Sequence, residues 1–294
     1  MQVQEKITKI LDIINYSADL LKQKNIKNAR LNAELLMGYV LKCDRLKLYM
    51  DFDKPLNESE RNEFKKLLLR RLSNEPLQYI TGETEFYGYK IKVDNRVLIP
   101  RQETEILVEE ILKEIDSGEN QKIKIFEIGT GSGCISIALA RELEKKSKDY
   151  EITSIDISQD AINLALENVE LNKLNSNKTK FLNESVFDLN YDLNEYNFII
   201  SNPPYISKND FENLDSEVKD YEPSVALTDN GDGFKFYEKI FSIANNLKKG
   251  SFIFCELSFN SKEKIEELLQ KFNIKNYNFT KDLSGIDRVL KINI

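Results

Sequence analysis

The chain has 294 residues, of which 41% are hydrophobic and 31% charged, an ordinary composition for a soluble globular protein with room for two domains. It contains no histidine, which excludes Ser-His and Cys-His nucleophile pairs and any histidine-ligated metal. Its net charge of -7 disfavours tight non-specific binding to nucleic acid, because such binding neutralises phosphates with cationic side chains. We therefore expect no stable nucleic-acid binding and no bound metal.

The sequence also bears on where the protein works. No apolar run approaches the roughly 20 residues that cross a membrane. The first residues, Met1–Lys6, lack the apolar region of a signal peptide. The cysteines, Cys43, Cys134 and Cys255, are widely spaced and indicate neither a disulfide framework nor a zinc site. We expect a cytoplasmic protein without membrane contact, and a monomer.

Residues 1–75 have the pattern of amphipathic helices. Apolar residues recur at spacings of three and four, as at Ile10 and Ile14. Asn57, followed three residues later by Glu60, predicts a capping box at the start of a further helix. This part of the chain has no glycine-rich loop and no cluster of reactive side chains. It is therefore interpreted as a small helical bundle used for docking or orientation.

Residues 76–102 differ from the helical part. Three stretches with glycine punctuation have β-like composition: Tyr79–Gly82, Phe86–Val93 and Val97–Pro100. They predict a hairpin that links two domains. A helix is expected to begin at Glu103.

Strand-like and helix-like segments then alternate to the end of the chain. Such alternation predicts a mostly parallel sheet with helices on both faces. The expected strands are Ile123–Glu127, Ile152–Asp156, Thr179–Leu182, Phe198–Ser201, Ser251–Leu257, Tyr277–Thr280 and Val289–Ile292. The expected helices are Cys134–Lys145, Gln159–Leu174 and Ser261–Lys271.

A glycine turn, Gly129–Gly133, follows the first of these strands and leads into a helix. Glycines let the backbone approach a ligand, and the helix N-terminus presents free N–H groups. A dinucleotide fingerprint needs its third glycine one residue later, where Cys134 stands. Glu127, just before the turn, is a poor neighbour for a pyrophosphate and a good one for a cationic amino-acid group.

Asp156 lies at the tip of the second expected strand, where an acidic side chain can accept both hydroxyl hydrogens of a ribose. Together with Glu127 and the glycine turn, it suits a nucleoside joined to a charged amino acid, namely S-adenosylmethionine. Two alternatives remain open. The turn alone is compatible with NAD or another nucleotide, and Asp156 alone can cap the next helix.

The most informative segment is Asn202-Pro203-Pro204-Tyr205, directly after an expected buried strand. Ligands of open α/β sheets bind at the carboxyl ends of strands. The Asn202 side-chain oxygen and a neighbouring backbone carbonyl can accept both hydrogens of an –NH2 group. An aromatic ring one step further can stack on a flat group. The segment therefore predicts a site for a planar amine or amide nitrogen, and the alternative is a strand-ending turn.

Six segments follow one another in a combination that is more specific than any of them alone. They are Pro76–Gly82, Glu85–Gly88, Val97–Glu105, Gly129–Gly133, Asn202–Ile206 and Tyr221–Pro223. With these segments the chain resembles the bacterial release-factor glutamine methyltransferases over nearly its whole length. The Asn-Pro-Pro-Tyr segment by itself occurs in many amino methyltransferases, including those acting on adenine.

The resemblance implies an α/β fold, with a Rossmann-type class I S-adenosylmethionine-dependent methyltransferase domain and an N-terminal all-helical domain. On this chain the helical bundle that docks the release factor would span residues 1–75, a β-hairpin linker 76–102 and the methyltransferase domain 103–294. The implied activity is methyl transfer from S-adenosylmethionine to the side-chain amide nitrogen (N5) of the glutamine in the Gly-Gly-Gln loop of translation release factors.

The resemblance also implies roles for individual residues. Cofactor binding is implied for Glu127, Gly129, Thr130, Gly131, Ser132, Gly133, Asp156, Ile157, Val186 and Asn202. Substrate binding is implied for Arg101, Asn202, Pro203, Pro204 and Tyr205, of which Asn202, Pro203 and Tyr205 are implied to be catalytic. We weigh a substrate contact and a simple acidic neighbour equally for Arg101. For Glu222-Pro223 we favour a simple turn over a role in shaping the pocket.

The chain departs from the family pattern in three places. Ser185 and Val186 stand where an acidic and an aromatic residue usually lie near the adenine, although Glu184 and Phe187 flank them and a shift of one residue would restore such a partner. Gln102 follows Arg101 where proline is common, and Ser258 stands where glycine often does. Three rival functions remain: an adenine-N6 or other nucleic-acid amino methyltransferase, a ribosomal-protein glutamine methyltransferase, and a cofactor-binding protein without turnover.

Overall fold

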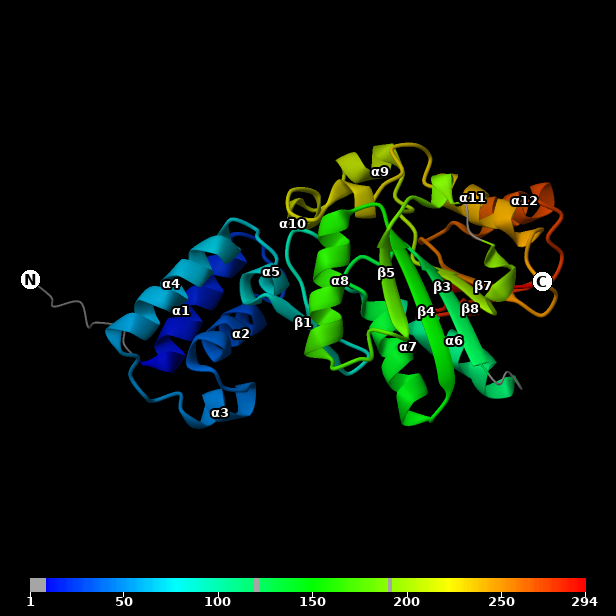
Figure 1. The fold of residues 1–294 in the computed structure, drawn as a ribbon. Coiled ribbons are helices and arrows are strands. Elements are labelled where there is room, and N and C mark those ends of the chain that lie inside the picture. Colours follow the sequence, from blue (N-terminus) through cyan, green and yellow to red (C-terminus); the bar gives the residue numbers. More distant parts are fainter. Residues whose placement is uncertain (1–8, 119–121, 190–191) are drawn as a thin grey trace, which may run out of the picture. The chain divides into compact units, whose positions relative to one another are not determined.

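A computed structural model describes residues 9–118, 122–189 and 192–294 (Figure 1). The chain divides into two compact units. One contains the residues up to Gly82 together with Ser216–Tyr221, and the other contains Glu83–Asp215 and Glu222–Ile294. None of the helices in these described ranges is long and apolar enough to cross a membrane.

The first unit is helical, as its apolar periodicity predicts from residue 9 onward; residues 1–8 lie outside the described ranges. The capping box is confirmed, because Asn57 Oδ1 accepts from the Glu60 N–H at 2.9 Å and Glu60 Oε2 accepts from the Asn57 N–H at 2.8 Å. Buried side chains that include Ile14, Met37 and Phe64 form its core. Its helices are α1 (Ile10–Gln23), α2 (Ala29–Leu41), α3 (Arg45–Met50), α4 (Glu58–Leu72) and α5 (Leu77–Thr81).

The helical unit also contains the separate segment Ser216–Tyr221, which includes the short helix α10 (Ser216–Lys219). The guanidinium of Arg71, which is 2% exposed, donates to a carboxylate oxygen of Glu217 at 2.7 Å. The hydroxyl of Tyr221 donates to the carbonyl oxygen of Ser73 at 2.7 Å. These bonds attach the segment to the end of α4.

Two expectations for residues 76–102 are wrong. Tyr79–Gly82 is not extended, because it forms most of α5, which starts after Pro76 and ends at Gly82 with φ of 76°. Val97–Pro100 is irregular backbone and pairs with no strand. Between them the hairpin is confirmed as β1 (Glu83–Phe86) and β2 (Tyr89–Lys92), which pair antiparallel.

The second unit is built on a seven-stranded sheet with the strand order β5-β4-β3-β6-β7-β9-β8. All neighbouring pairs are parallel except those that include β9, which runs antiparallel to β7 and to β8. The strands are β3 (Lys122–Ile128), β4 (Asp149–Asp156), β5 (Thr179–Asn183), β6 (Phe198–Ser201), β7 (Phe252–Glu256), β8 (Tyr277–Lys281) and β9 (Asp287–Asn293). The expected strands and the α/β class are confirmed.

Helices alternate with these strands (Figure 1). The helices α6 (Thr104–Ser117), α7 (Cys134–Lys145) and α8 (Gln159–Leu171) contact one another in sequence order. Two others, α11 (Lys235–Ala244) and α12 (Lys262–Lys271), share a core cluster with strand residues that include Phe126, Ile199 and Ile253. The sequence did not predict α11 or the short α9 (Lys208–Glu212).

The strand order brings three strand ends together. From β3 the chain proceeds to β4 and β5 on one side, and later to β6 and β7 on the other. In the ladder, Ile128 at the end of β3 pairs with Ile155 on β4 and with Ser201 on β6. The glycine turn, Asp156 and Asn202 therefore follow neighbouring strands at the point where the strand order reverses, which is where open α/β sheets bind ligands.

Candidate active site

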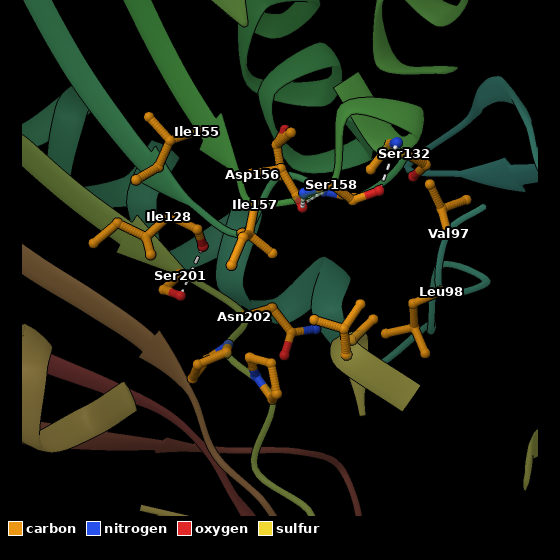
Figure 2. A pocket seen from close by; sticks show the side chains of 18 of the residues that line it. Val97, Leu98, Ile128, Ser132, Ile155, Asp156, Ile157, Ser158, Ser201 and Asn202 are labelled. Carbon is orange, nitrogen blue, oxygen red and sulfur yellow. Dashed lines mark hydrogen bonds between the residues drawn. The ribbon is translucent and has the colours of Figure 1, made fainter. Parts of the chain in front are cut away.

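A cavity opens at this edge of the sheet, within the second unit (Figure 2). Its empty space is about 1080 Å³, the open mouth included. Most of the residues expected in the site line it: Arg101, Gly129, Thr130, Gly131, Ser132, Asp156, Ile157, Val186, Asn202, Pro203 and Pro204. Glu127, Gly133 and Tyr205 are not among the residues that line it.

The glycine turn is fastened to the end of β4 by its own backbone. The N–H groups of Gly129 and Thr130 donate to the carbonyl of Ile155 at 2.9 and 3.1 Å. The N–H of Gly131 donates to Asp156 Oδ2 at 2.8 Å. Because Gly131 has φ of 53°, in the left-handed region, a residue with a side chain is strained there. The turn therefore presents bare backbone to the cavity.

Gly133, expected to bind the cofactor, has a packing role in the structure. Its φ is 79°, and a Cβ built on it would lie 3.1 Å from the Cβ of Ala165 on α8. The third glycine of the turn therefore allows α7 and α8 to approach closely. The next residue, Cys134, does line the cavity, but burial raises the pKa of its thiol to about 12. A thiol that remains protonated is not a nucleophile at neutral pH.

Glu127 lies beneath the turn and is fully buried. Its Oε2 accepts from the Thr130 hydroxyl at 2.8 Å and from the Ser136 hydroxyl, while Oε1 has no hydrogen-bond partner in the described part of the chain. Burial raises the pKa of this carboxyl, and the bonds from Ser136 and Thr130 oppose the rise. In this structure Glu127 supports the turn through Thr130 and does not reach the cavity directly.

Asp156 faces the cavity with spare acceptor capacity. Its Oδ2 accepts from the Gly131 N–H, and its Oδ1 accepts from the Ser158 N–H at 2.9 Å. Burial raises the pKa of the carboxyl, and these two backbone bonds oppose the rise. Each oxygen retains a further lone pair. The alternative role as a helix cap is wrong, because Ser158 caps α8 by accepting from the Ala161 N–H at 3.2 Å.

The residues after β5 line the cavity and include an aromatic pair. The rings of Phe187 and Phe236 meet edge to face with centroids 5.2 Å apart, and both line the cavity. The ammonium of Lys235 lies 4.8 Å from the centre of the Phe187 ring. Aromatic side chains are therefore present beside Ser185 and Val186, one of them on the helix α11 that sequence reasoning missed.

Asn202 is oriented by a partner from another helix. Its Nδ2 donates to the hydroxyl oxygen of Thr104, the first residue of α6, at 3.2 Å. The amide oxygen Oδ1 is therefore the end of the side chain that remains to accept hydrogen bonds in the cavity. The Ser201 hydroxyl donates to the Ile128 carbonyl at 2.8 Å, which joins the ends of β6 and β3. Figure 2 shows the Asn202 side chain across the cavity from Asp156.

Tyr205, expected to wall the substrate pocket, directs its hydroxyl elsewhere. It donates to Glu256 Oε1 at 3.2 Å, at the end of β7. Glu256 is only 2% exposed, and burial raises the pKa of its carboxyl to about 7, although hydrogen bonds from Thr104 and Tyr205 oppose the rise. Neither Glu256 nor Thr104 was expected in the site from the sequence.

Arg101 lines the cavity and has an acidic neighbour. Its Nη2 donates to both carboxylate oxygens of Glu222, at 2.7 and 2.8 Å, and the Glu222 side chain is 1% exposed. Glu222-Pro223 is more than the favoured turn, and the alternative role in shaping the pocket agrees with the structure. Glu222 is a buried ion-pair partner, and Pro223 itself lines the cavity.

Two family models match the chain. One, the PrmC N-terminal domain, matches residues 12–82, and the other, the methyltransferase small domain, matches residues 102–218. Among solved structures, the hMettl16 catalytic domain in complex with MAT2A 3'UTR hairpin 1 is similar in fold. The TM-score is 0.55 at 17% identity, and the match covers 81% of each chain. At this identity the likeness shows the fold alone.

Curated relatives match the chain almost from end to end. A release factor glutamine methyltransferase of Fusobacterium nucleatum is 41% identical over 283 residues, which cover 95% of this chain and 77% of the relative. Those of Geobacter sulfurreducens and Chlorobaculum tepidum are 36% and 34% identical, and each match covers at least 98% of both chains. The chain therefore belongs to the release factor glutamine methyltransferase family.

Proposed function

We propose that this protein transfers a methyl group from S-adenosylmethionine to the side-chain amide nitrogen (N5) of the glutamine in the Gly-Gly-Gln loop of translation release factors. The relatives that match nearly the whole chain are named release factor glutamine methyltransferases, which supports the methyl transfer and its substrate class. Within the site, the proposal depends on the hydrogen bond from Asn202 Nδ2 to Thr104. This bond leaves the Asn202 amide oxygen as a hydrogen-bond acceptor in the cavity. The nucleic-acid and ribosomal-protein alternatives are not favoured.

The cavity suits the cofactor. The oxygens of Asp156 can accept two ribose hydroxyls, and the turn from Gly129 to Ser132 leaves room for the amino-acid part against bare backbone. Phe187 and Phe236 supply apolar surface for a flat base. The cofactor supplies an electrophilic methyl group on a sulfonium sulfur. The buried Glu127 stabilises the glycine turn through its hydrogen bond from the Thr130 hydroxyl.

On the substrate side, the reacting nitrogen is a weak nucleophile because its lone pair is delocalised into the carbonyl. Asn202 Oδ1 and the Pro203 carbonyl would accept its two hydrogens, which favours a pyramidal nitrogen with its lone pair directed at the methyl group. Positioning and electrostatics then supply the rate, and no general base is required before transfer. The surplus proton leaves the methylated amide to solvent.

The helical unit is proposed to hold the release factor. Two apolar side chains on α3, Leu46 and Met50, are 72% and 74% exposed, which is large for residues of this kind. Changing Leu46 and Met50 to glutamate is expected to raise the KM for the release factor and to leave kcat unchanged.

We further propose that the enzyme acts as a monomer in the cytoplasm, where translation takes place.

The test of the function is a methyl-transfer assay with labelled S-adenosylmethionine. A release factor, its variant with alanine for the loop glutamine, ribosomal proteins and DNA are offered in parallel. Label is expected on the release factor and is expected to disappear with the glutamine variant. Label that persists on this variant, or that appears instead on DNA or ribosomal protein, would overturn the proposed substrate.

A further inference from the structure

The loop Leu227–Phe234, which leads into α11, holds the chain that follows the Asn-Pro-Pro-Tyr segment. The Ile206 N–H donates to the Leu227 carbonyl at 2.9 Å. The Lys208 N–H donates to the Gly231 carbonyl, also at 2.9 Å. The backbone just beyond the proposed substrate-binding residues is therefore joined to this loop at two points.

Gly233 brings the loop against the end of the Asn-Pro-Pro-Tyr segment. This glycine is buried, and its φ is 89°. A Cβ built on it would overlap the carbonyl oxygen of Tyr205 and lie 3.1 Å from the Tyr205 carbonyl carbon and 3.4 Å from the Ser207 nitrogen. These are backbone atoms, so rotation of a side chain cannot relieve the overlap. The contact between loop and segment therefore requires glycine at this position.

Asp229 gives the loop its fixed shape. One carboxylate oxygen accepts from the Gly231 N–H at 2.7 Å and from the Gly233 N–H at 3.1 Å. The other accepts from the Gly233 N–H at 3.1 Å and from the Lys235 N–H at 3.1 Å. Lys235 is the first residue of α11, where a helix leaves N–H groups without partners inside the helix. One side chain therefore fastens Gly233 to the start of α11.

The loop is anchored more firmly than the peptide group that it touches. The helix that continues from it, α11, buries Tyr237 and Phe241 completely in the core. The Tyr205 side chain is held as well, because its hydroxyl donates to Glu256 Oε1 at 3.2 Å. A group added at Gly233 is therefore expected to displace the Tyr205 carbonyl and to pass the displacement back along the backbone.

Two prolines separate Tyr205 from Asn202. Their rings fix φ, so this stretch has few rotations that could absorb a displacement. A shift that starts at the Tyr205 carbonyl therefore reaches the Pro203 carbonyl, one of the two proposed acceptors for the substrate amide. The other acceptor, the Asn202 amide oxygen, belongs to the residue directly before it.

We propose that Gly233 is a positioning residue, which sets the place of the two substrate-amide acceptors through its contact with the Tyr205 carbonyl, and that Asp229 holds it there. The inference rests on the proposed function, because the groups that it positions are the acceptors for that substrate. Gly233 is not among the residues that line the cavity, so it acts through the backbone of Tyr205. S-adenosylmethionine binding, which depends on Asp156 and the glycine turn, is expected to be independent of it.

The test is Gly233→Ala in the full-length enzyme. Three quantities are measured: kcat and KM for the release factor at saturating S-adenosylmethionine, and the affinity for S-adenosylmethionine by calorimetry. The kcat is expected to fall by about a hundredfold, because misplacing a reacting group by about 1 Å costs about that much. The KM and the cofactor affinity are expected to change little.

The matched control is Gly285→Ala, in the turn between β8 and β9. Gly285 has φ of 81°, so alanine is strained there as it is at Gly233. The added Cβ meets no neighbouring atom within 4 Å. This variant is expected to lose stability in urea unfolding and to keep the wild-type kcat. The comparison separates strain of the left-handed backbone from displacement of the Tyr205 carbonyl.

Two substitutions of Asp229 test the same positioning without adding a group at Gly233, and they decide the matter if Gly233→Ala does not fold. Asp229→Ala removes all of the carboxylate bonds and is expected to lower kcat by roughly tenfold, for a smaller displacement. Asp229→Asn keeps an oxygen that can accept from the Gly231 and Gly233 N–H groups, but its NH2 group cannot accept from Lys235. Its kcat is expected to lie between those of Asp229→Ala and the wild type.

The inference is overturned if folded Gly233→Ala keeps the wild-type kcat, or if it loses cofactor affinity in proportion to its loss of rate. It is also overturned if Asp229→Ala keeps the wild-type kcat. These outcomes differ from failure of the proposed function, in which the wild-type enzyme itself transfers no methyl group to the release factor.

Discussion

At the scale of single residues, the role of a side chain in this site depends on the partner that orients it. Asn202 is an acceptor in the cavity because Thr104 takes its Nδ2 hydrogen. Asp156 can receive a ribose because each of its oxygens is held by only one backbone N–H. Arg101 is held by Glu222, so its guanidinium is fixed at the cavity wall by a buried carboxylate.

Asn202→Ala removes the side-chain acceptor and is expected to lower kcat by about a hundredfold to a thousandfold, the usual effect of deleting one preorganised polar group. Affinity for S-adenosylmethionine should change much less, because Asp156 and the glycine turn remain. Steady-state methyl transfer to a release factor, together with calorimetric titration of the cofactor, checks both. Near-normal turnover would rule out the assigned role.

Glu256 also predicts a pH dependence of stability. Its pKa is raised in the folded state, from 4.5 to about 7, so the folded protein loses stability as pH rises through this window. Glu256→Gln removes that loss. From pH 5 to pH 8 its unfolding free energy should gain about 2 to 3 kcal/mol relative to wild type. Urea unfolding at both pH values tests this, and an equal difference at the two would contradict it.

At the scale of elements, the regular alternation of strands and helices could be predicted from the sequence, and the exceptions have physical causes. Apolar β-branched runs predicted the strands, and the glycine turn predicted its helix. Tyr79–Gly82 has β-like composition, but a short helix forms there because it buries Tyr79 and Ile80 after Pro76. At α11, Phe234 before the helix and Phe236 in its first turn obscure the helical period formed by Tyr237, Ile240, Phe241 and Ala244.

The parts of the candidate site that lie in short continuous segments could be predicted from the sequence. Gly129–Gly133 and Asn202–Tyr205 indicate a cofactor and an amide nitrogen by their residue types and by their positions directly after strands. Thr104 and Glu256 were missed because their contacts with the site are to residues about a hundred and about fifty positions away, the separations of their bonds to Asn202 and Tyr205. No local pattern in one sequence encodes such a pairing.

The close approach of α7 and α8 yields a test. Gly133→Ala should destabilise the protein by about 2 kcal/mol or more, because the left-handed backbone is strained with a side chain and the new Cβ meets Ala165. Gly250→Ala is the matched control. Gly250 has φ of 83°, so alanine is strained there too, but the added Cβ meets no neighbouring atom within 4 Å. Only the strain of the left-handed backbone is therefore expected to lower the stability of this variant. If chemical unfolding shows equal losses of stability for the two variants, the packing role assigned to Gly133 is wrong.

At the scale of the whole molecule, the chain crosses from one compact unit to the other more than once. It leaves the methyltransferase unit after Asp215, contributes Ser216–Tyr221 to the helical unit and returns at Glu222. This segment lies between Tyr205, which ends the Asn-Pro-Pro-Tyr segment, and Glu222, which is paired with Arg101. Both ends of the excursion are therefore close in sequence to residues of the site.

Arg71→Ala tests the anchor of this segment. It removes the buried donor to Glu217, so hydrogen exchange of the backbone amides in Ser216–Tyr221 should accelerate by about tenfold or more, as expected from losing about 2 kcal/mol of charged hydrogen bonding. Lys66→Ala, which removes an exposed ion pair on α4, should leave these amides unchanged. Unaltered exchange in the Arg71 variant would show that the segment is held in some other way.

The same excursion determines how the protein can be divided. A cut at Gly82 yields two contiguous pieces, but the smaller lacks Ser216–Tyr221 and the larger carries that segment without the rest of its unit. The larger piece would retain Glu217 and Tyr221 without Arg71 and Ser73, and the smaller would expose the buried guanidinium of Arg71. Deleting the N-terminal helices would therefore disturb the chain between Tyr205 and Glu222 as well as remove the proposed docking surface. Point substitutions on intact α3 separate these two effects, and truncation does not.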